Sequence, residues 1–144
     1  QASLVGRRIG QANIGAYAHR DYLQRRGTPR RPEDLLLHEL IGNDRQADIV
    51  RGFAAAGHAV TREHFGLRTD DLVAYEALVR AGAGIGFLPR YVAHRSPELV
   101  PVLPSLAVPP LPMWLVAHRE IRSNPAIRAV WSHLAQALPA ELGH

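Results

Sequence analysis

A predicted helix that leads through a glycine-rich turn into a predicted strand constrains the fold more than any other part of the sequence. Thr69 or Asp70 can cap this helix, and Gly82 or Gly84 can end it in the left-handed conformation that glycine adopts at little cost. Between the cap and the glycines, apolar residues recur at spacings of three and four: Leu72, Tyr75, Leu78 and Val79. The apolar run at residues 85–89 follows directly and predicts a short buried strand.

Segments of the same two kinds alternate along the rest of the chain. Strands are predicted over residues 4–10, 12–18, 38–41, 99–103 and 113–117, with one or two more within 59–69. Helical segments are predicted over residues 21–27, 32–36, 90–95 and 125–138. Trp131 is expected to anchor the last helix and Pro139 to close it, whereas residues 49–55 are only weakly patterned. This alternation predicts an α/β fold with a mostly parallel sheet.

Composition limits the classes of protein that the chain can belong to. Its 144 residues, 47% of them hydrophobic, suffice for one domain or two small lobes with a real core. The absence of cysteine excludes disulfides, thiolate metal ligands and cysteine nucleophiles. No apolar run approaches the roughly 18 residues that a membrane span needs, and no signal peptide is visible at the start. We therefore expect no membrane partner.

The positive charge is concentrated at the start of the sequence. The formal net charge is +4, and all 17 basic residues are arginine. Residues 1–31 carry seven arginines against Asp21 alone, a net of +6, and the remaining ten arginines face twelve acidic residues, a net of −2. A basic surface indicates nucleic-acid binding only together with a docking motif, and the sequence contains none. The arginines are therefore interpreted as surface charges.

No pattern of residues indicates catalysis. The glycines of residues 82–86 follow a helix and precede a strand, the reverse of the order in a dinucleotide-binding loop. The eight histidines lack the spacing of metal ligands, and no turn of the Gly-x-Ser-x-Gly type presents a serine nucleophile. Asp70 and Asp71 are most simply a cap and a dipole partner at a helix start. We expect no enzyme activity, no metal and no cofactor.

Several short motifs occur in an order that resembles the effector-binding region of bacterial LysR-type transcriptional regulators. They lie at residues 4–10, 16–23, 27–29, 32–35, 71–89 and 119–128. The most specific is the Ala-Gly-x-Gly-Ile-x-x-Leu-Pro run at residues 81–89, and the order of the motifs extends the resemblance over nearly the whole chain.

This resemblance implies a periplasmic-binding-protein-like (type II) fold of two α/β lobes that are joined by crossing strands and hold an effector in the cleft. Residues 13–94 would form a complete second lobe, and residues 1–12 with 95–144 part of the first. The family carries an N-terminal winged helix-turn-helix, which has no counterpart in this sequence. By this likeness the chain is expected to be a truncated fragment.

The resemblance also implies a function and a site. The chain would sense a small-molecule effector in the cytoplasm, associate as a homo-dimer or tetramer, and reach DNA only through the missing N-terminal domain. Positions that match the family's second-lobe contacts are Asn43, Thr69, Asp70, Gly84, Ile85 and Phe87. Asp70 and Asp71 depart from the expected pattern because two carboxylates would oppose an anionic effector.

Two other functions remain open from the sequence. One is a solute-binding protein of the same fold that serves a transporter, which a secretion signal upstream of residue 1 would favour and a helix-turn-helix there would exclude. The other is an enzyme of a small-molecule pathway built on a similar two-lobe scaffold, for which turnover of a candidate ligand would be the evidence.

Overall fold

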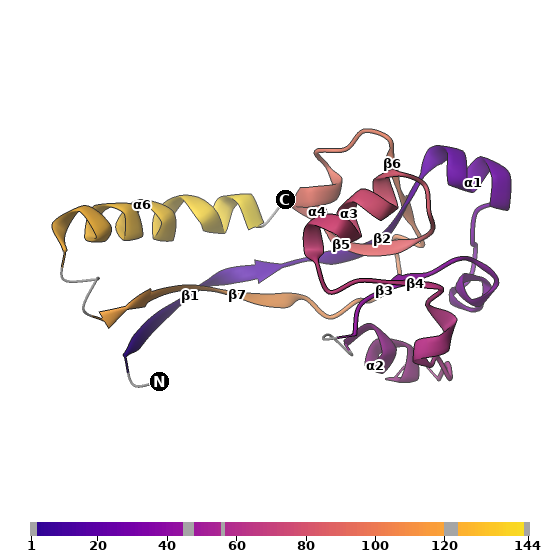
Figure 1. Cartoon of the computed structure of the whole chain (residues 1–144), viewed down its shortest axis with the longest axis horizontal. Coiled ribbons are helices and arrows are strands. Elements are labelled where there is room, and N and C mark those ends of the chain that lie inside the picture. The colour runs from indigo at the N-terminus through magenta and orange to yellow at the C-terminus, as the bar shows by residue number, and fades with distance from the viewer. Residues whose placement is uncertain (1–2, 45–47, 56, 120–123, 143–144) are drawn as a thin grey trace. The chain divides into compact units, whose positions relative to one another are not determined.

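A computed structural model describes residues 3–44, 48–55, 57–119 and 124–142 of the chain (Figure 1). These residues belong to two compact units: Ile14–Pro109, and Gln1–Asn13 together with Pro110–His144. The larger unit contains β2 (Ile14–His19), α1 (Arg20–Arg26), the 3-10 helix η1 (Pro32–Leu37), β3 (Ile41–Gly42), α2 (Asp48–Ala55), the 3-10 helix η2 (Arg62–His64), β4 (Leu67–Arg68), α3 (Leu72–Arg80), β5 (Gly86–Pro89), α4 (Arg90–Ala93) and β6 (Leu99–Val102). The smaller unit contains β1 (Leu4–Ala12), β7 (Leu111–His118) and α6 (Pro125–Leu142).

The sheet of the larger unit is mixed. β2 lies between β5 and β6 and runs antiparallel to both. A parallel bridge between Leu40 and Ile85 connects β5 to the parallel pair β3–β4. In this bridge the Ile41 amide donates to the Ile85 carbonyl at 2.9 Å, and the Ile85 amide donates to the Glu39 carbonyl at 2.8 Å. The expectation of a mostly parallel sheet is therefore wrong for the described strands, because β2 runs against both of its neighbours.

Alternate residues of the central strands face two separate hydrophobic clusters. Ala16, Ala18 and Phe87 belong to one cluster, which also contains residues of α1, η1 and α2. Tyr17 and Leu88 belong to the other, where Tyr75 and Val79 of α3 pack beside Ala93 of α4. Because successive side chains of a strand point to opposite faces, the two clusters lie on the two faces of the sheet. Helices therefore cover both faces, as an α/β fold requires.

The boundaries of α3 differ from the expected ones in a way that matters for the candidate site. Its cap is Asp71, whose Oδ1 accepts the amides of Val73 and Ala74 at 2.8 and 3.1 Å. Thr69 and Asp70, the expected caps, precede it. At the other end Gly82 has the left-handed φ of +72°, whereas Gly84 does not adopt a positive φ. Gly82 is therefore the glycine that lets the chain leave the helix.

Other expectations were wrong in the segment between η1 and α3. Residues 49–55, weakly patterned in the sequence, form most of the helix α2. The strand expected within residues 59–69 is reduced to the two residues of β4, preceded by η2. Beyond that segment, residues 95–109 lie in the larger unit, where β6 pairs with β2. The correspondence of the two units to the family's lobes stays a prediction.

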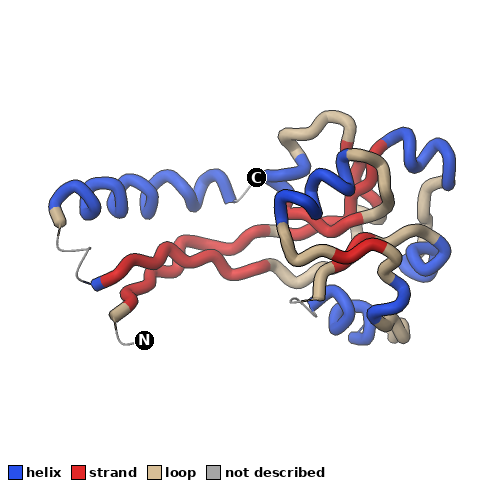
Figure 2. The backbone as a smooth tube through the Cα atoms, viewed as in Figure 1, coloured by secondary structure: helices blue, strands red, loops and turns tan. Residues whose placement is uncertain are grey.

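The smaller unit is an antiparallel ribbon of β1 and β7 with α6 alongside it, drawn in red and blue in Figure 2. Along β7 half-buried and exposed side chains alternate, so that Leu115 is half-buried and Trp114 exposed. α6 continues through Pro139 to Leu142, so the expectation that Pro139 closes it is wrong. A proline so close to a helix end removes one backbone hydrogen bond and leaves the earlier turns intact. Trp131 is half-buried, while Ala135 and Leu142 are the buried residues of the helix.

Candidate functional site

Three of the predicted site residues lie together where β3 and β4 end. Asn43 follows β3, and Thr69 and Asp70 follow β4. Because the two strands are parallel, their carboxyl ends lie at the same edge of the sheet. The Thr69 amide donates to the Gly42 carbonyl at 3.0 Å, and the Asp44 amide donates to Asp70 Oδ1 at 2.8 Å. We call Asn43, Thr69 and Asp70 the polar edge.

Arginines balance the acidic groups around the polar edge. The Nε and Nη2 groups of Arg62 each donate to the Asp44 carboxylate at 2.9 Å, a bidentate pair. Arg68 Nε lies 3.5 Å from the same carboxylate. Hydrogen bonding to Asp44, with added attraction from Asp70, raises the pKa of Arg62. Two guanidinium groups therefore lie beside the Asp44 carboxylate and offset part of the negative charge at this edge.

The polar side chains at the start of α3 form hydrogen bonds with the helix's own backbone. Thr69 Oγ1 accepts the Asp71 amide at 3.2 Å, and the Asp71 carboxylate accepts the next two free amides of the helix. Asp71 is thus a helix cap, with both capping bonds made to its Oδ1. The Thr69 hydroxyl hydrogen and the Asn43 carboxamide supply hydrogen-bonding groups of both kinds at this edge. Groups of these two kinds are those that a site for a small polar molecule requires.

Gly84 and Ile85 lie inside the sheet and away from the surface. Ile85 is fully buried, and its backbone forms both hydrogen bonds of the bridge to β3. A Cβ on Gly84 would lie 2.4 Å from the Glu39 carbonyl oxygen, so glycine is required there for the close approach of two backbones. Both residues support the strands that carry the polar edge.

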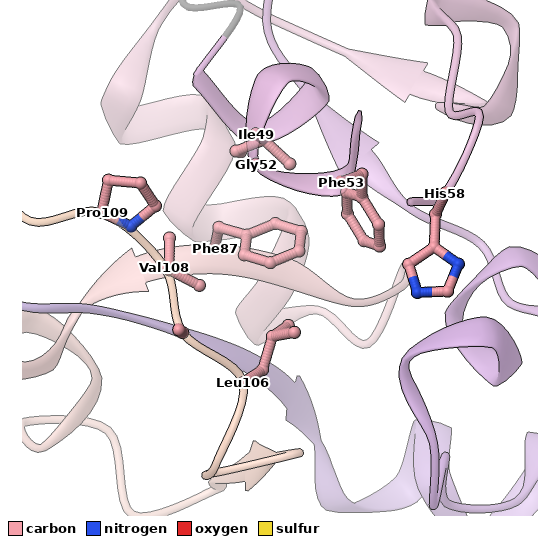
Figure 3. A pocket seen from close by; sticks show the side chains of 9 residues that line it. Ile49, Gly52, Phe53, His58, Phe87, Leu106, Val108 and Pro109 are labelled. Carbon is pink, nitrogen blue, oxygen red and sulfur yellow. The ribbon is translucent and has the colours of Figure 1, made fainter. Parts of the chain in front are cut away.

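Phe87 lines a different hollow, shown from close by in Figure 3. This apolar pocket lies between α2 and the segment that leads to β7, and its lining is Ile49, Gly52, Phe53, His58, Phe87, Leu106, Ala107, Val108 and Pro109. The rings of Phe53 and Phe87 meet edge to face, with centroids 6.1 Å apart. The cavity volume of about 30 Å³ accommodates one or two water-sized groups. None of the other five predicted residues lines it.

Tyr75 is a positioning residue that the sequence did not single out. Its hydroxyl donates to the Ile41 carbonyl at 2.8 Å and accepts the Phe87 amide at 2.9 Å. It therefore joins β3 to β5 beyond the point where their backbone pairing ends. Burial raises the pKa of Tyr75 to about 12, which keeps the hydroxyl a donor. The sequence feature that could have identified Tyr75 is its place on the apolar face of a predicted helix. A tyrosine hydroxyl that is buried there needs a hydrogen-bond partner.

A second hydrogen-bonded group fixes the chain before β3. The Tyr22 hydroxyl donates to Glu39 Oε2 at 2.8 Å, accepts the Glu39 amide at 3.0 Å, and lies 3.0 Å from His38 Nδ1. Arg26 pairs with Glu39 at 3.1 Å. The hydrogen bond from Tyr22 lowers the pKa of Glu39, and burial lowers the pKa of His38. This group ties α1 to residues 38–40 and so positions the strand that ends at Asn43.

The residues with described positions contain no group of three or more histidine, aspartate or glutamate side chains placed to hold a metal ion. None of their helices is long and apolar enough to cross a membrane.

Comparison with solved structures gives the fold a context. The regulatory domain of CrgA, a LysR-type transcriptional regulator from Neisseria meningitidis, has 22% identity and a TM-score of 0.75, with 94% of this chain and 69% of that chain covered. The AmpR effector binding domain from Citrobacter freundii has 18% identity and a TM-score of 0.76, with coverage of 94% and 68%. The regulatory domain of AphB from Vibrio vulnificus has 19% identity and a TM-score of 0.64, with coverage of 93% and 69%. The chain thus spans about two thirds of these domains.

Sequence comparison identifies the family. No curated protein matches the chain. The family described as LysR substrate binding domain matches residues 1–139, nearly the whole sequence. Members of this family are regulatory domains without enzyme activity, which excludes the pathway enzyme considered from the sequence. The resemblance seen in the motifs is confirmed, and the chain belongs to the LysR substrate-binding domain family.

Proposed function

We propose that the chain is the sensing part of a LysR-type transcription regulator and that its effector binds against the polar edge formed by Asn43, Thr69 and Asp70. The family match supports the sensing role. The observation that carries the site is the convergence of three residues from two separate loops at the carboxyl ends of the parallel strands β3 and β4. Ligands of α/β sheets commonly bind beyond the carboxyl ends of the strands.

The proposed effector is a small polar molecule that both donates and accepts hydrogen bonds. The Asn43 carboxamide offers both kinds of group, and the Thr69 hydroxyl can donate while its oxygen accepts the Asp71 amide. Asp70 braces the loop after β3 through the Asp44 amide. In this proposal Gly84 and Ile85 act indirectly, by holding β3 in place, and Phe87 contributes through its own pocket.

We further propose that the signal reaches DNA through a winged helix-turn-helix outside these residues, within a cytoplasmic homo-oligomer. An effector that prefers one arrangement of the regulator over another shifts the population toward it, and the coupling acts equally in both directions. The support for this part is the family membership alone.

A thermal-shift screen tests the proposed site. Small polar metabolites at millimolar concentration should include at least one that raises Tm, because a ligand that binds only the folded state stabilises it. Thr69→Val removes the hydroxyl with little change in volume and should abolish most of that shift. Thr28→Val, at an exposed position before η1, is the matched control and should retain it. Compounds that stabilise Thr69→Val and Asn43→Ala as much as the unmodified chain would place the effector elsewhere.

A further inference from the structure

A second hollow within the larger unit shares no lining residue with the polar edge and has a different chemistry. It has a volume of about 380 Å³, within the size range of small-molecule sites, and it lies between α4, the loop after α4 and β6. Its polar lining residues are Tyr17, Arg90, His94 and Ser96. None of the residues that form the polar edge or the apolar pocket of Figure 3 lines this hollow.

A cation on α4 faces the hollow without an acidic partner. Arg90 forms no ion pair with any carboxylate in the part of the chain that the structure describes. Its charge acts instead on Tyr17, where it opposes the rise in pKa that burial causes. His94 follows Arg90 by four residues and lies on the same side of the helical turn. Glu98, the acidic residue of the neighbouring loop, is held by Arg80 at 2.9 Å.

Two largely buried residues that carry hydroxyl groups accompany this cation. Tyr17 and Ser96 are each 5% exposed and both line the hollow. The Tyr17 ring lies over Gly15, where a Cβ would come within 3.0 Å of the ring and 3.2 Å of its oxygen. Because burial keeps the Tyr17 hydroxyl protonated, it remains a hydrogen-bond donor. The absence of a side chain at position 15 therefore leaves the phenol room beside Arg90.

The loop that carries Ser96 is held by backbone hydrogen bonds, so the hollow is preformed. The Ser96 amide donates to the Ala93 carbonyl, and the Leu99 amide donates to the Ser96 carbonyl, both at 3.0 Å. From α1, the Arg20 amide donates to the Glu98 carbonyl at 3.0 Å. A preformed site spends less binding free energy on ordering its loops.

The other lining residues are apolar. They include Leu99, Pro101 and Pro104, and these two prolines have no amide hydrogen to offer a ligand. A lining that combines a cation and hydroxyl donors with apolar side chains matches a molecule with a compact negative group and a hydrocarbon body. We propose that this hollow binds a small carboxylate with an apolar body, at a site separate from the polar edge.

The guanidinium group of Arg90 is the main recognition element in this proposal, since its planar fork fits a carboxylate. The Tyr17 and Ser96 hydroxyls donate to the same group, and the apolar lining residues contact the hydrocarbon. An anion without a hydrocarbon body lacks the second contact, and an uncharged alcohol lacks the first. Binding measurements with these two ligand types therefore test the contact with Arg90 and the apolar contact separately.

A nuclear magnetic resonance titration of the 144-residue chain with phenylacetate tests the proposal. Saturable shifts should appear at Tyr17, Arg90 and Ser96, and 2-phenylethanol and inorganic phosphate should each bind at least about tenfold more weakly. Phosphate binding as tight as phenylacetate binding would overturn the assigned ligand class. Saturable shifts confined to Asn43 and Thr69 would overturn the separate site.

Matched variants test the named residues. Arg90→Gln, at an exposed position, should weaken phenylacetate binding about tenfold or more, and Tyr17→Phe by a few fold. Gly15→Ala should also weaken it, because the added Cβ pushes the phenol ring. Arg128→Gln, an exposed helical arginine of the smaller unit, is the control and should leave binding unchanged. Thr69→Val should also leave it unchanged, which separates this site from the proposed effector site. An unchanged affinity in both Arg90→Gln and Tyr17→Phe would refute the proposal.

Discussion

At the scale of single residues, the glycine turn shows what the sequence could and could not predict. The pattern identified Gly82 and Gly84 as the two places where the helix could end. It could not choose between them, because the choice depends on residues far away in the chain. The backbone turns at Gly82, with φ at +72°, and Gly84 faces the Glu39 carbonyl two residues before β3. Glycine is required at position 82 for its backbone conformation and at position 84 for the space that a side chain would fill.

This difference predicts unequal effects of alanine at the two positions. Gly84→Ala would place a Cβ 2.4 Å from a backbone oxygen that already accepts the Ile85 amide, so we expect a loss of about 2–4 kcal/mol. Gly82→Ala has more room, with His19 Cβ at 3.5 Å, but forces alanine into a left-handed conformation at a cost of about 1–2 kcal/mol. Urea unfolding followed by circular dichroism measures both losses.

The control for these two variants is Gly66→Ala. A Cβ at Gly66 would have no neighbour within 4 Å, and its φ is not in the left-handed region. We expect a change within about 0.5 kcal/mol. A smaller loss for Gly84→Ala than for Gly82→Ala would contradict the close approach of the two backbones.

At the scale of elements, strong periodicity in the sequence predicted helices and strands correctly, whereas the direction of strand pairing could not be predicted. The stripe of α3 and the apolar run of β5 led to correct elements, because each pattern reports its own local burial. The direction of pairing depends on which distant strands meet, and β2 meets β5 and β6 antiparallel. The region 59–69 resembled a strand in composition, yet the Thr61 amide is held by His64 Nδ1 at 3.0 Å in a 3-10 turn. Local hydrogen bonding of this kind competes with sheet formation.

The connection between α1 and β3 predicts a dependence of stability on pH. The pKa of His38 is lowered from 6.5 by burial, so the unfolded chain binds this proton more tightly and stability falls as the pH drops through 6.5. The pKa of Glu39 is lowered from 4.5 by the Tyr22 hydroxyl, so its contribution is present above 4.5 and is lost below it. Both groups therefore destabilise the fold on acidification.

Tyr22→Phe tests this connection. It removes the hydroxyl that serves Glu39 and His38 while keeping the buried ring, and we expect a loss of about 1–3 kcal/mol at pH 7. The fall in stability below pH 4.5 should become shallower, since the pKa of Glu39 would return toward its ordinary value. Tyr91→Phe, at a half-buried tyrosine of α4, should change neither quantity. Thermal melts at a series of pH values measure both effects. If the fall in stability below pH 4.5 were unchanged in Tyr22→Phe, the Tyr22 hydroxyl would be excluded as its cause.

At the scale of the whole molecule, the order of motifs predicted more than any single motif. Residues 4–10, 16–23 and 81–89 are each short, but their sequence order indicated the family that the comparison confirms. The candidate site was predicted in part. Asn43, Thr69 and Asp70 meet because parallel strands bring their carboxyl ends together, whereas Ile85 is buried inside the sheet. A motif identifies a position in the chain, and packing decides whether its side chain faces a ligand or the core.

The distribution of charge over the chain predicts how strongly and how specifically it binds DNA. The arginines of residues 1–31 give a local net charge of +6, but several are engaged within the fold. Arg26 pairs with Glu39 at 3.1 Å, Arg31 with Asp34 at 3.4 Å, and Arg25 donates to the Gly82 carbonyl at 3.3 Å. We therefore expect weak binding that is independent of sequence, with a dissociation constant of about 10⁻⁴ M or weaker at physiological salt.

Fluorescence anisotropy with two unrelated duplexes of equal length measures this binding. The two affinities should agree within about threefold and fall together as salt rises from about 50 to 200 mM, because counterion release supplies the binding free energy. Replacement of the exposed Arg7 and Arg8 of β1 by glutamine should weaken both affinities alike, since arginine contacts with phosphate groups do not depend on the base sequence. A preference of more than about tenfold for one duplex that persists at the higher salt would require base contacts. That result would contradict the assignment of DNA recognition to a separate domain.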